Sequence, residues 1–219
     1  MNQVIIDKMK REVMVVKNDH LFADISREDR FYSNDEINID EIVNKHYEFM
    51  VRWEAEDNRE YKQPIGYAAV VDTENKVFVY KRGGKDSKAW EARLHSKYAF
   101  GVGWHIERED EDSENILRDS MLREVEEELE ISPSDIMSSD PLGYINFDSD
   151  DVSEVHIWAG YIVRVKHNNI SLLDWELASW EYMTIDQIEE LISSGECDLE
   201  SWSKILFPSL KKALPVSYT

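Results

Sequence analysis

The sequence predicts an α/β (α+β) fold in which helices pack on both faces of a mixed sheet. β-rich runs and amphipathic helical stretches alternate along the 219 residues. Apolar residues make up 42% of the chain and include seven Trp and ten Tyr, which favours a packed core. No repeat or Pro/Gly/Ser-rich linker divides the chain. We therefore expect one domain over 1–219, with 1–60 as an N-terminal strand/helix extension and 184–219 as C-terminal helices.

The individual elements follow from hydrophobic periodicity and capping signals. Helical spacing of apolar residues predicts a helix over 39–55, and Asn38 with Glu41 offers a capping box at its start. The next helix, over 113–129, has Asp112 or Ser113 as its expected cap. The remaining expectations are strands at 65–71, 77–81, 98–102, 142–147 and 155–165, and helices at 185–192 and 202–214.

Charge and composition limit the class of function. The formal net charge of -21 disfavours binding to a nucleic-acid duplex, but a divalent cation can still bring a phosphate-bearing small molecule to an acidic site. We expect no membrane span, because no apolar stretch reaches roughly 18 to 20 residues. The single cysteine, Cys197, and the lack of a signal-peptide pattern favour the cytoplasm. A homodimer is left open.

A cluster of glutamates carries the strongest chemical signal. On a helix, Glu124, Glu127 and Glu128 stand at i, i+3 and i+4 and share one face. Like charges at this spacing cost a few tenths of a kcal/mol per pair, so another interaction must favour them. Either the cluster is a solvated helix face, or its hard oxygen atoms bind Mg²⁺ or Mn²⁺. The spacing by itself leaves both explanations open.

The surrounding residues favour the metal site. The stretch resembles the signature box of the Nudix hydrolases, Gly-x5-Glu-x7-Arg-Glu-U-x-Glu-Glu-x-Gly-U, in which U is aliphatic. Residues 101–107 resemble the family's Gly-Gly-His-Val-Glu segment, 77–82 resemble its strand that ends in a basic residue, and Glu176 with Trp180 resembles a late Glu-x-x-x-Trp element. The resemblance spans about residues 60–195 and looks closest to bacterial Nudix-type predicted phosphoesterases. The box residues in register are Arg123, Glu124, Val125, Glu127, Glu128 and Ile131.

This chain departs from the family pattern at three points. Trp104 stands where a second glycine is usual, and Glu130 replaces the late glycine. The loop between Glu107 and Arg123 is longer than the box allows, so the first box glutamate is not assigned. Glu109, Glu111 and Glu114 are its candidates.

The resemblance implies a Nudix-like α/β/α sandwich and a metal-dependent hydrolase that cleaves a phosphate anhydride with metal-activated water. Glu124, Glu127 and Glu128 would bind Mg²⁺ or Mn²⁺ together with the carbonyl of Gly103. Arg123 would orient a carboxylate, which makes it the fourth member of the catalytic set. The expected partner is a nucleotide-like small molecule, and its candidate phosphate contacts are Arg82, Arg93 and Lys97.

Several alternatives stay open at this stage. The altered Trp104 and Glu130 also fit a non-catalytic ligand-sensing or binding module on the same fold. An isopentenyl-diphosphate isomerase-like activity would need a catalytic cysteine, and Cys197 lies far from the box in sequence. The general base is open between Glu154 and Glu176. His105 and His156 are interpreted as histidines satisfied by local hydrogen bonds and stand outside the predicted metal set.

Overall fold

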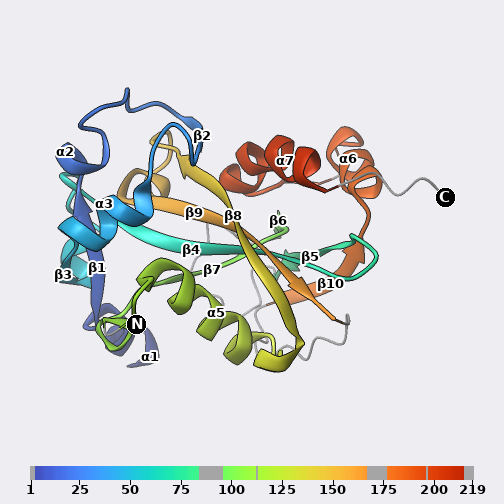
Figure 1. Cartoon of the computed structure of the whole chain (residues 1–219), viewed down its shortest axis with the longest axis horizontal. Coiled ribbons are helices and arrows are strands. Elements are labelled where there is room, and N and C mark those ends of the chain that lie inside the picture. The colour runs from blue at the N-terminus through green and yellow to red at the C-terminus, as the bar shows by residue number, and fades with distance from the viewer. Residues whose placement is uncertain (1–2, 84–95, 112, 167–176, 196, 215–219) are drawn as a thin grey trace. The chain divides into compact units, whose positions relative to one another are not determined.

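The computed structural model describes residues 3–83, 96–111, 113–166, 177–195 and 197–214. The chain divides into two compact units. Unit 1 comprises 1–67, 103–123 and 143–160, and unit 2 comprises 68–102, 124–142 and 161–219. Five elements continue from one unit into the other: β4 (Tyr61–Val71), β7 (Val102–His105), α5 (Ile116–Glu128), β8 (Ile136–Asn146) and β9 (His156–Val165). Figure 1 shows each of them as a continuous element. A single domain over 1–219 stays a prediction.

Unit 1 is built around β1 (Glu12–Lys17), whose four central residues are buried. β1 pairs antiparallel with β3 (Glu48–Val51) through Met14 and Phe49, and with the start of β4 through Val16 and Lys62. Another antiparallel pair joins β2 (Arg30–Ser33) to the end of β8. The other elements of unit 1 are α1 (Gln3–Met9), α2 (Asn18–Leu21), α3 (Ile39–His46), α4 (Arg52–Ala55), η2 (Arg108–Asp110) and η4 (Ser153–Val155).

Unit 2 contains an antiparallel arrangement around β5 (Val77–Arg82). β5 pairs with β10 (Leu177–Met183) and with β6 (Tyr98–Ala99), and Val77 pairs with Val71 at the end of β4. Within the described residues, the main path of hydrogen-bonded strands runs β10-β5-β4-β9-β8-β2. The predicted α/β class is therefore confirmed. The remaining elements of unit 2 are η3 (Pro133–Asp135), α6 (Ile185–Ser193) and α7 (Ser201–Ala213).

The predicted helix over 39–55 is wrong at 47–51, which separate α3 from the short helix α4 over 52–55. Its start is as expected, because the Asn38 side chain accepts a hydrogen bond from the amide of Glu41. The helix ends at His46, and residues 48–51 form β3 instead. Pairing with β1 satisfies the backbone groups of this segment, and its aromatic and β-branched residues suit a strand. Tertiary pairing therefore overrides the helical periodicity here.

Two other boundaries differ from the expectation. The predicted strand over 98–102 is divided into β6 and β7, because the chain leaves its pairing with β5 after Ala99. The helix predicted from 113 begins at Ile116, and the Asn115 side chain accepts from the amide of Arg118, 3.1 Å away. Asn115 thus takes the capping role expected of Asp112 or Ser113. In the described residues, no helix has both the length and the apolar character needed to cross a bilayer.

A buried lysine organises one end of unit 1. The side chain of Lys62 on β4 is fully buried, and its Nζ atom donates to Asp148 Oδ1 at 2.7 Å. Nζ also donates to the carbonyl oxygens of Ser153, Glu154 and His156 at 3.0–3.3 Å. Burial lowers the pKa of Lys62 to about 8 against the opposing effect of Asp148. The pKa of Asp148 falls to about 2, because hydrogen bonds from Arg27 and Lys62 outweigh its partial burial.

The first prediction concerns this lysine. Lys62→Met keeps most of the side-chain volume but removes the ammonium group, so three carbonyls lose a donor and Asp148 loses a cation. Loss of one partner of a buried ion pair costs about 3–5 kcal/mol of unfolding free energy. Urea unfolding measures this loss. Lys76→Met is the matched control, because Lys76 pairs with Glu74 on the surface. Equal stability losses in the two variants would contradict the structural role assigned to the buried Lys62.

Candidate functional site

The glutamate cluster lies on the C-terminal half of α5. The helix runs unbroken over residues 116–128 (Figure 1), so Glu124, Glu127 and Glu128 share a face as predicted. Glu124 and Glu128 are half-buried, because they flank the buried stripe that contains Met121 and Val125. Glu127 is exposed. Carboxylate oxygens grouped on one helix face are ligands of the kind that a hard divalent cation binds.

Close packing holds the first half of α5 against β4. A Cβ atom at Gly66 on β4 would lie 2.6 Å from Met121 Cβ, so only glycine permits this approach. On β7, a Cβ at Gly103 would lie 2.9 Å from Tyr67 Cδ2. The backbone of Gly103 therefore runs close to β4. Gly103 belongs to unit 1 and the three glutamates to unit 2, and the four residues stay a predicted ligand set.

Arg123 orients a carboxylate that the sequence analysis did not single out. Its guanidinium donates to both oxygens of Asp110, with Nε 3.0 Å from Oδ1. Asp110 is 8% exposed and also accepts from Ser120 Oγ and from the amide of Glu107. These bonds fasten η2 to α5. The available signal was a capping-box spacing between Glu107 and Asp110, which the structure forms.

The two predicted phosphate contacts that the structure describes, Arg82 and Lys97, have carboxylate partners. Arg82, on β5, donates from Nε to Glu200 Oε1 at 2.5 Å. Lys97 Nζ lies 3.8 Å from Asp198 Oδ2, and Arg93 is outside the described residues. Glu200 is fully buried, and burial raises its pKa while the charge of Arg82 opposes that rise. Arg82 therefore stabilises a buried charge in unit 2.

A second prediction follows for Arg82. Arg82→Ala leaves the Glu200 carboxylate buried without this cation, which costs about 3–5 kcal/mol of unfolding free energy at neutral pH. The deficit should shrink as the pH falls, because a folded-state pKa raised above the unfolded value lets the variant protonate Glu200 first. Denaturant unfolding at several pH values tests this. Lys211→Ala is the control, because Lys211 pairs with Glu189 on the surface, and its expected loss is below about 1 kcal/mol with no such pH trend.

Glu130, which stands where the Nudix box has its last glycine, has the backbone conformation that glycine usually adopts. Glu130, two residues beyond the end of α5, has φ of 49°, in the left-handed region. That conformation terminates helices and usually requires glycine. A non-glycine residue there is strained by about 1–2 kcal/mol. The departure from the family pattern thus changes the residue type but not the turn.

The third prediction is that Glu130→Gly stabilises the protein. Relief of strain exceeds the extra freedom that glycine gives the unfolded chain, so we expect a gain of up to about 1 kcal/mol in unfolding free energy. Thermal and urea unfolding measure it. Glu190→Gly, within α6, should instead destabilise by about 1 kcal/mol, because that helical position gains nothing from glycine. A stability loss in both variants would refute the strain argument.

The other sequence-level alternatives also have definite environments. Glu154 forms an ion pair with Arg59, and Glu176 lies outside the described residues. The Cys197 thiol donates to the carbonyl of Leu191 at 3.2 Å, and partial burial raises its pKa. A raised pKa lowers the thiolate fraction, so this cysteine lacks the activation that a thiol nucleophile needs.

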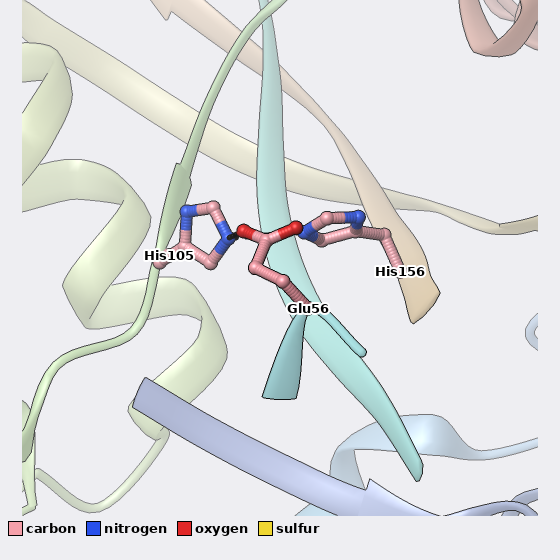
Figure 2. Close-up of side chains that lie close together, drawn as sticks. All are labelled: Glu56, His105 and His156. Atoms are coloured by element: carbon pink, nitrogen blue, oxygen red, sulfur yellow. Dashed lines mark hydrogen bonds and ion pairs between the residues drawn. The ribbon is translucent and has the colours of Figure 1, made fainter. Parts of the chain in front are cut away.

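A second group of metal-binding side chains lies wholly within unit 1. Glu56 follows α4, His105 ends β7 and His156 begins β9, and one ligand atom of each lies within 4.8 Å of the others. Figure 2 shows the three side chains pointing toward one another. The two Nε2 atoms are 3.0 Å apart, and His105 Nε2 lies 4.0 Å from Glu56 Oε1. Burial lowers the pKa of both imidazoles, which favours their neutral form.

The sequence does not predict this convergence. Locally satisfied histidines are the expectation from sequence, and His156 meets it, being buried with its Nδ1 2.5 Å from the carbonyl of Val152. The three residues lie far apart in sequence, and Glu56 follows a helix whose predicted extent was wrong. No local spacing links them, so only the strand arrangement reveals the group.

Comparisons with known proteins place these observations in a family context. No family model matches the chain. Protein YmaB of Bacillus subtilis (strain 168) is 28% identical over 212 residues, which cover 93% of this chain and 99% of that protein. Tm1382, a candidate Nudix hydrolase, is 25% identical, covers 93% of this chain and all of its own, and superposes with a TM-score of 0.75.

A more distant structure agrees at the level of the fold alone. The NUDIX domain of Shewanella oneidensis NrtR, solved in complex with ADP ribose, is 12% identical, with a TM-score of 0.51. The alignment covers 69% of this chain and 88% of that domain. The likeness to Tm1382 over nearly the whole chain confirms the fold that the sequence predicted.

Proposed function

From its membership of the Nudix family, we infer that this chain is a divalent-metal-dependent hydrolase of phosphate anhydrides. The observation that carries this proposal is the face of α5, where Glu124, Glu127 and Glu128 stand together directly after Arg123. A cytoplasmic location and a homodimer stay predictions.

The residues of α5 suit a hard divalent cation. Carboxylate and carbonyl oxygens are the ligands that Mg²⁺ and Mn²⁺ prefer, and Glu124, Glu127, Glu128 and the carbonyl of Gly103 supply only oxygen. When bound, such an ion would neutralise charge on phosphate oxygens and lower the pKa of a coordinated water molecule. The carboxylates would hold the ion, and α5 fixes their spacing.

The neighbouring side chains have supporting roles. Arg123 binds Asp110 and so holds η2 on α5, which makes it a positioning residue. Arg82, Lys97 and Arg93 stay proposed phosphate contacts, because an anionic substrate needs positive partners. For Arg82, phosphate binding has to leave its bond to the buried Glu200 in place.

The proposed substrate class is a nucleoside diphosphate linked to another moiety. The NrtR domain was solved with ADP ribose, a compound of this class, so ADP ribose belongs in the first screen. A ligand-binding module without turnover is the alternative, and it stands on the altered residues Trp104 and Glu130. Release of phosphate or a monophosphate in the presence of Mg²⁺ or Mn²⁺ separates the two functions.

The fourth prediction is that Glu127→Gln and Glu128→Gln each lower turnover by a factor on the order of 10² or more. Glutamine is nearly isosteric with glutamate and has a similar helix propensity, so only the charge is lost. Initial rates with saturating Mg²⁺ or Mn²⁺ measure the effect, and circular dichroism verifies the fold.

Glu126→Gln provides the matched control on the same helix. Glu126 lies about 100° around α5 from Glu127, and burial and the charge of Glu127 raise its pKa. Removing its charge should leave turnover within a factor of about three, below 1 kcal/mol of barrier. If Glu127→Gln and Glu128→Gln behave like this control, the catalytic assignment of α5 is wrong.

A further inference from the structure

We propose that Glu56, His105 and His156 form a second metal site, which binds a divalent transition ion of the zinc class independently of α5. The three residues supply two imidazole nitrogens and a carboxylate oxygen within 4.8 Å of one another. Two His and one Glu form a known donor set for Zn²⁺, whereas Mg²⁺ prefers oxygen ligands alone. The site therefore differs in metal preference from the glutamates of α5.

The distances are close to those of a coordinated ion. Zn–N bonds of about 2.0–2.1 Å at a tetrahedral angle place two nitrogens about 3.3 Å apart. The two Nε2 atoms are 3.0 Å apart, and the carboxylate oxygen is 4.0 Å from His105 Nε2. The two nitrogens need to separate by about 0.3 Å, and the Glu56 oxygen needs to approach His105 Nε2 by about 0.7 Å, for all three atoms to reach coordination range. The rings lie at 73° to each other, so both can direct Nε2 to one point.

Neighbouring groups hold two of the three proposed ligands, His156 and Glu56, in place through hydrogen bonds. His156 Nδ1 faces the carbonyl of Val152, which can only accept, so Nδ1 carries the proton and the Nε2 lone pair faces the group. Metal-binding histidines commonly donate their other N–H to a backbone carbonyl in this way. Glu56 is held by Arg52, whose Nε donates to Oε1 at 3.1 Å. Lys62 holds the carbonyl of His156 and thereby fixes the start of β9.

A hydrogen bond between the two imidazoles is the competing explanation. It requires His105 to donate from Nε2 to the lone pair of His156, and it accounts for the 3.0 Å separation. This hydrogen bond does not explain the position of Glu56. The Glu56 carboxylate and the lone pair of His156 Nε2 are both acceptors, and two acceptors close together repel each other. The single proton on His105 Nε2 would have to be shared between two acceptors. One cation, by contrast, can bind all three atoms, the two imidazole nitrogens and the carboxylate oxygen. The convergence of three lone-pair donors therefore favours the metal.

The test uses Co²⁺ as a spectroscopic probe of the full chain. Protein stripped with a chelator is titrated with Co²⁺, and visible absorption, which reports nitrogen and oxygen ligation, is recorded. We expect the absorption of nitrogen-ligated Co²⁺ to saturate at one ion per chain and to be displaced by Zn²⁺. His105→Gln and Glu56→Gln should each weaken Co²⁺ binding at least about tenfold. Absence of stoichiometric Co²⁺ binding in the unaltered protein overturns the proposal and leaves the imidazole hydrogen bond as the explanation.

Two controls keep the result specific. His46→Gln alters another close histidine pair, His20 and His46, whose stacked rings have centroids 4.0 Å apart, and it should leave the Co²⁺ absorption unchanged. Glu127→Gln should also leave it unchanged, so the outcome is independent of the proposed hydrolase site. Retention of Co²⁺ binding by His105→Gln and Glu56→Gln overturns the assignment. Because Glu56 is 22% exposed in its side chain, Glu56→Gln should fold even if a histidine variant does not.

Discussion

The buried ammonium group of Lys62 is the constraint on which unit 1 depends. A charge taken out of water must be surrounded by acceptors, and Lys62 finds four: Asp148 and the carbonyls of Ser153, Glu154 and His156. Those carbonyls belong to the turn that precedes β9 and to its first residue. Satisfying one lysine therefore fixes where β9 starts and, with it, the position of His156.

The same principle recurs at two other places in this acidic chain. Asp110 is buried with Arg123, and Glu200 is buried with Arg82. In each case an arginine fixes a carboxylate that would otherwise be too costly to bury. The first pair fastens η2 to α5 in unit 1, and the second connects β5 to the start of α7 in unit 2. Several of the basic residues thus have structural roles. This reduces the number of Lys and Arg side chains that could serve only to bind a ligand.

The two proposed metal environments differ in chemistry. On α5 the donors are carboxylates on one exposed or half-buried helix face, an arrangement suited to a hard ion that keeps part of its hydration shell. In unit 1 the donors are two neutral imidazoles and one carboxylate at the ends of separate elements, which suits a borderline transition ion. An ion in unit 1 would also connect α4, β7 and β9, so it would stabilise that unit as well as offer an open coordination position.

Local sequence determined the elements whose signals lie within a few residues. The glutamate face of α5, the strands near 77–81 and 155–165, and the helix near 185–192 all follow from periodicity and neighbouring side chains, and the structure confirms them. Tertiary structure decided the rest. Pairing with β1 made 48–51 a strand, burial gave Asp110 its partner Arg123, and strand placement brought His105 to His156 across 51 residues. Periodicity records which face of an element is buried, but it carries no information on which distant element will cover that face.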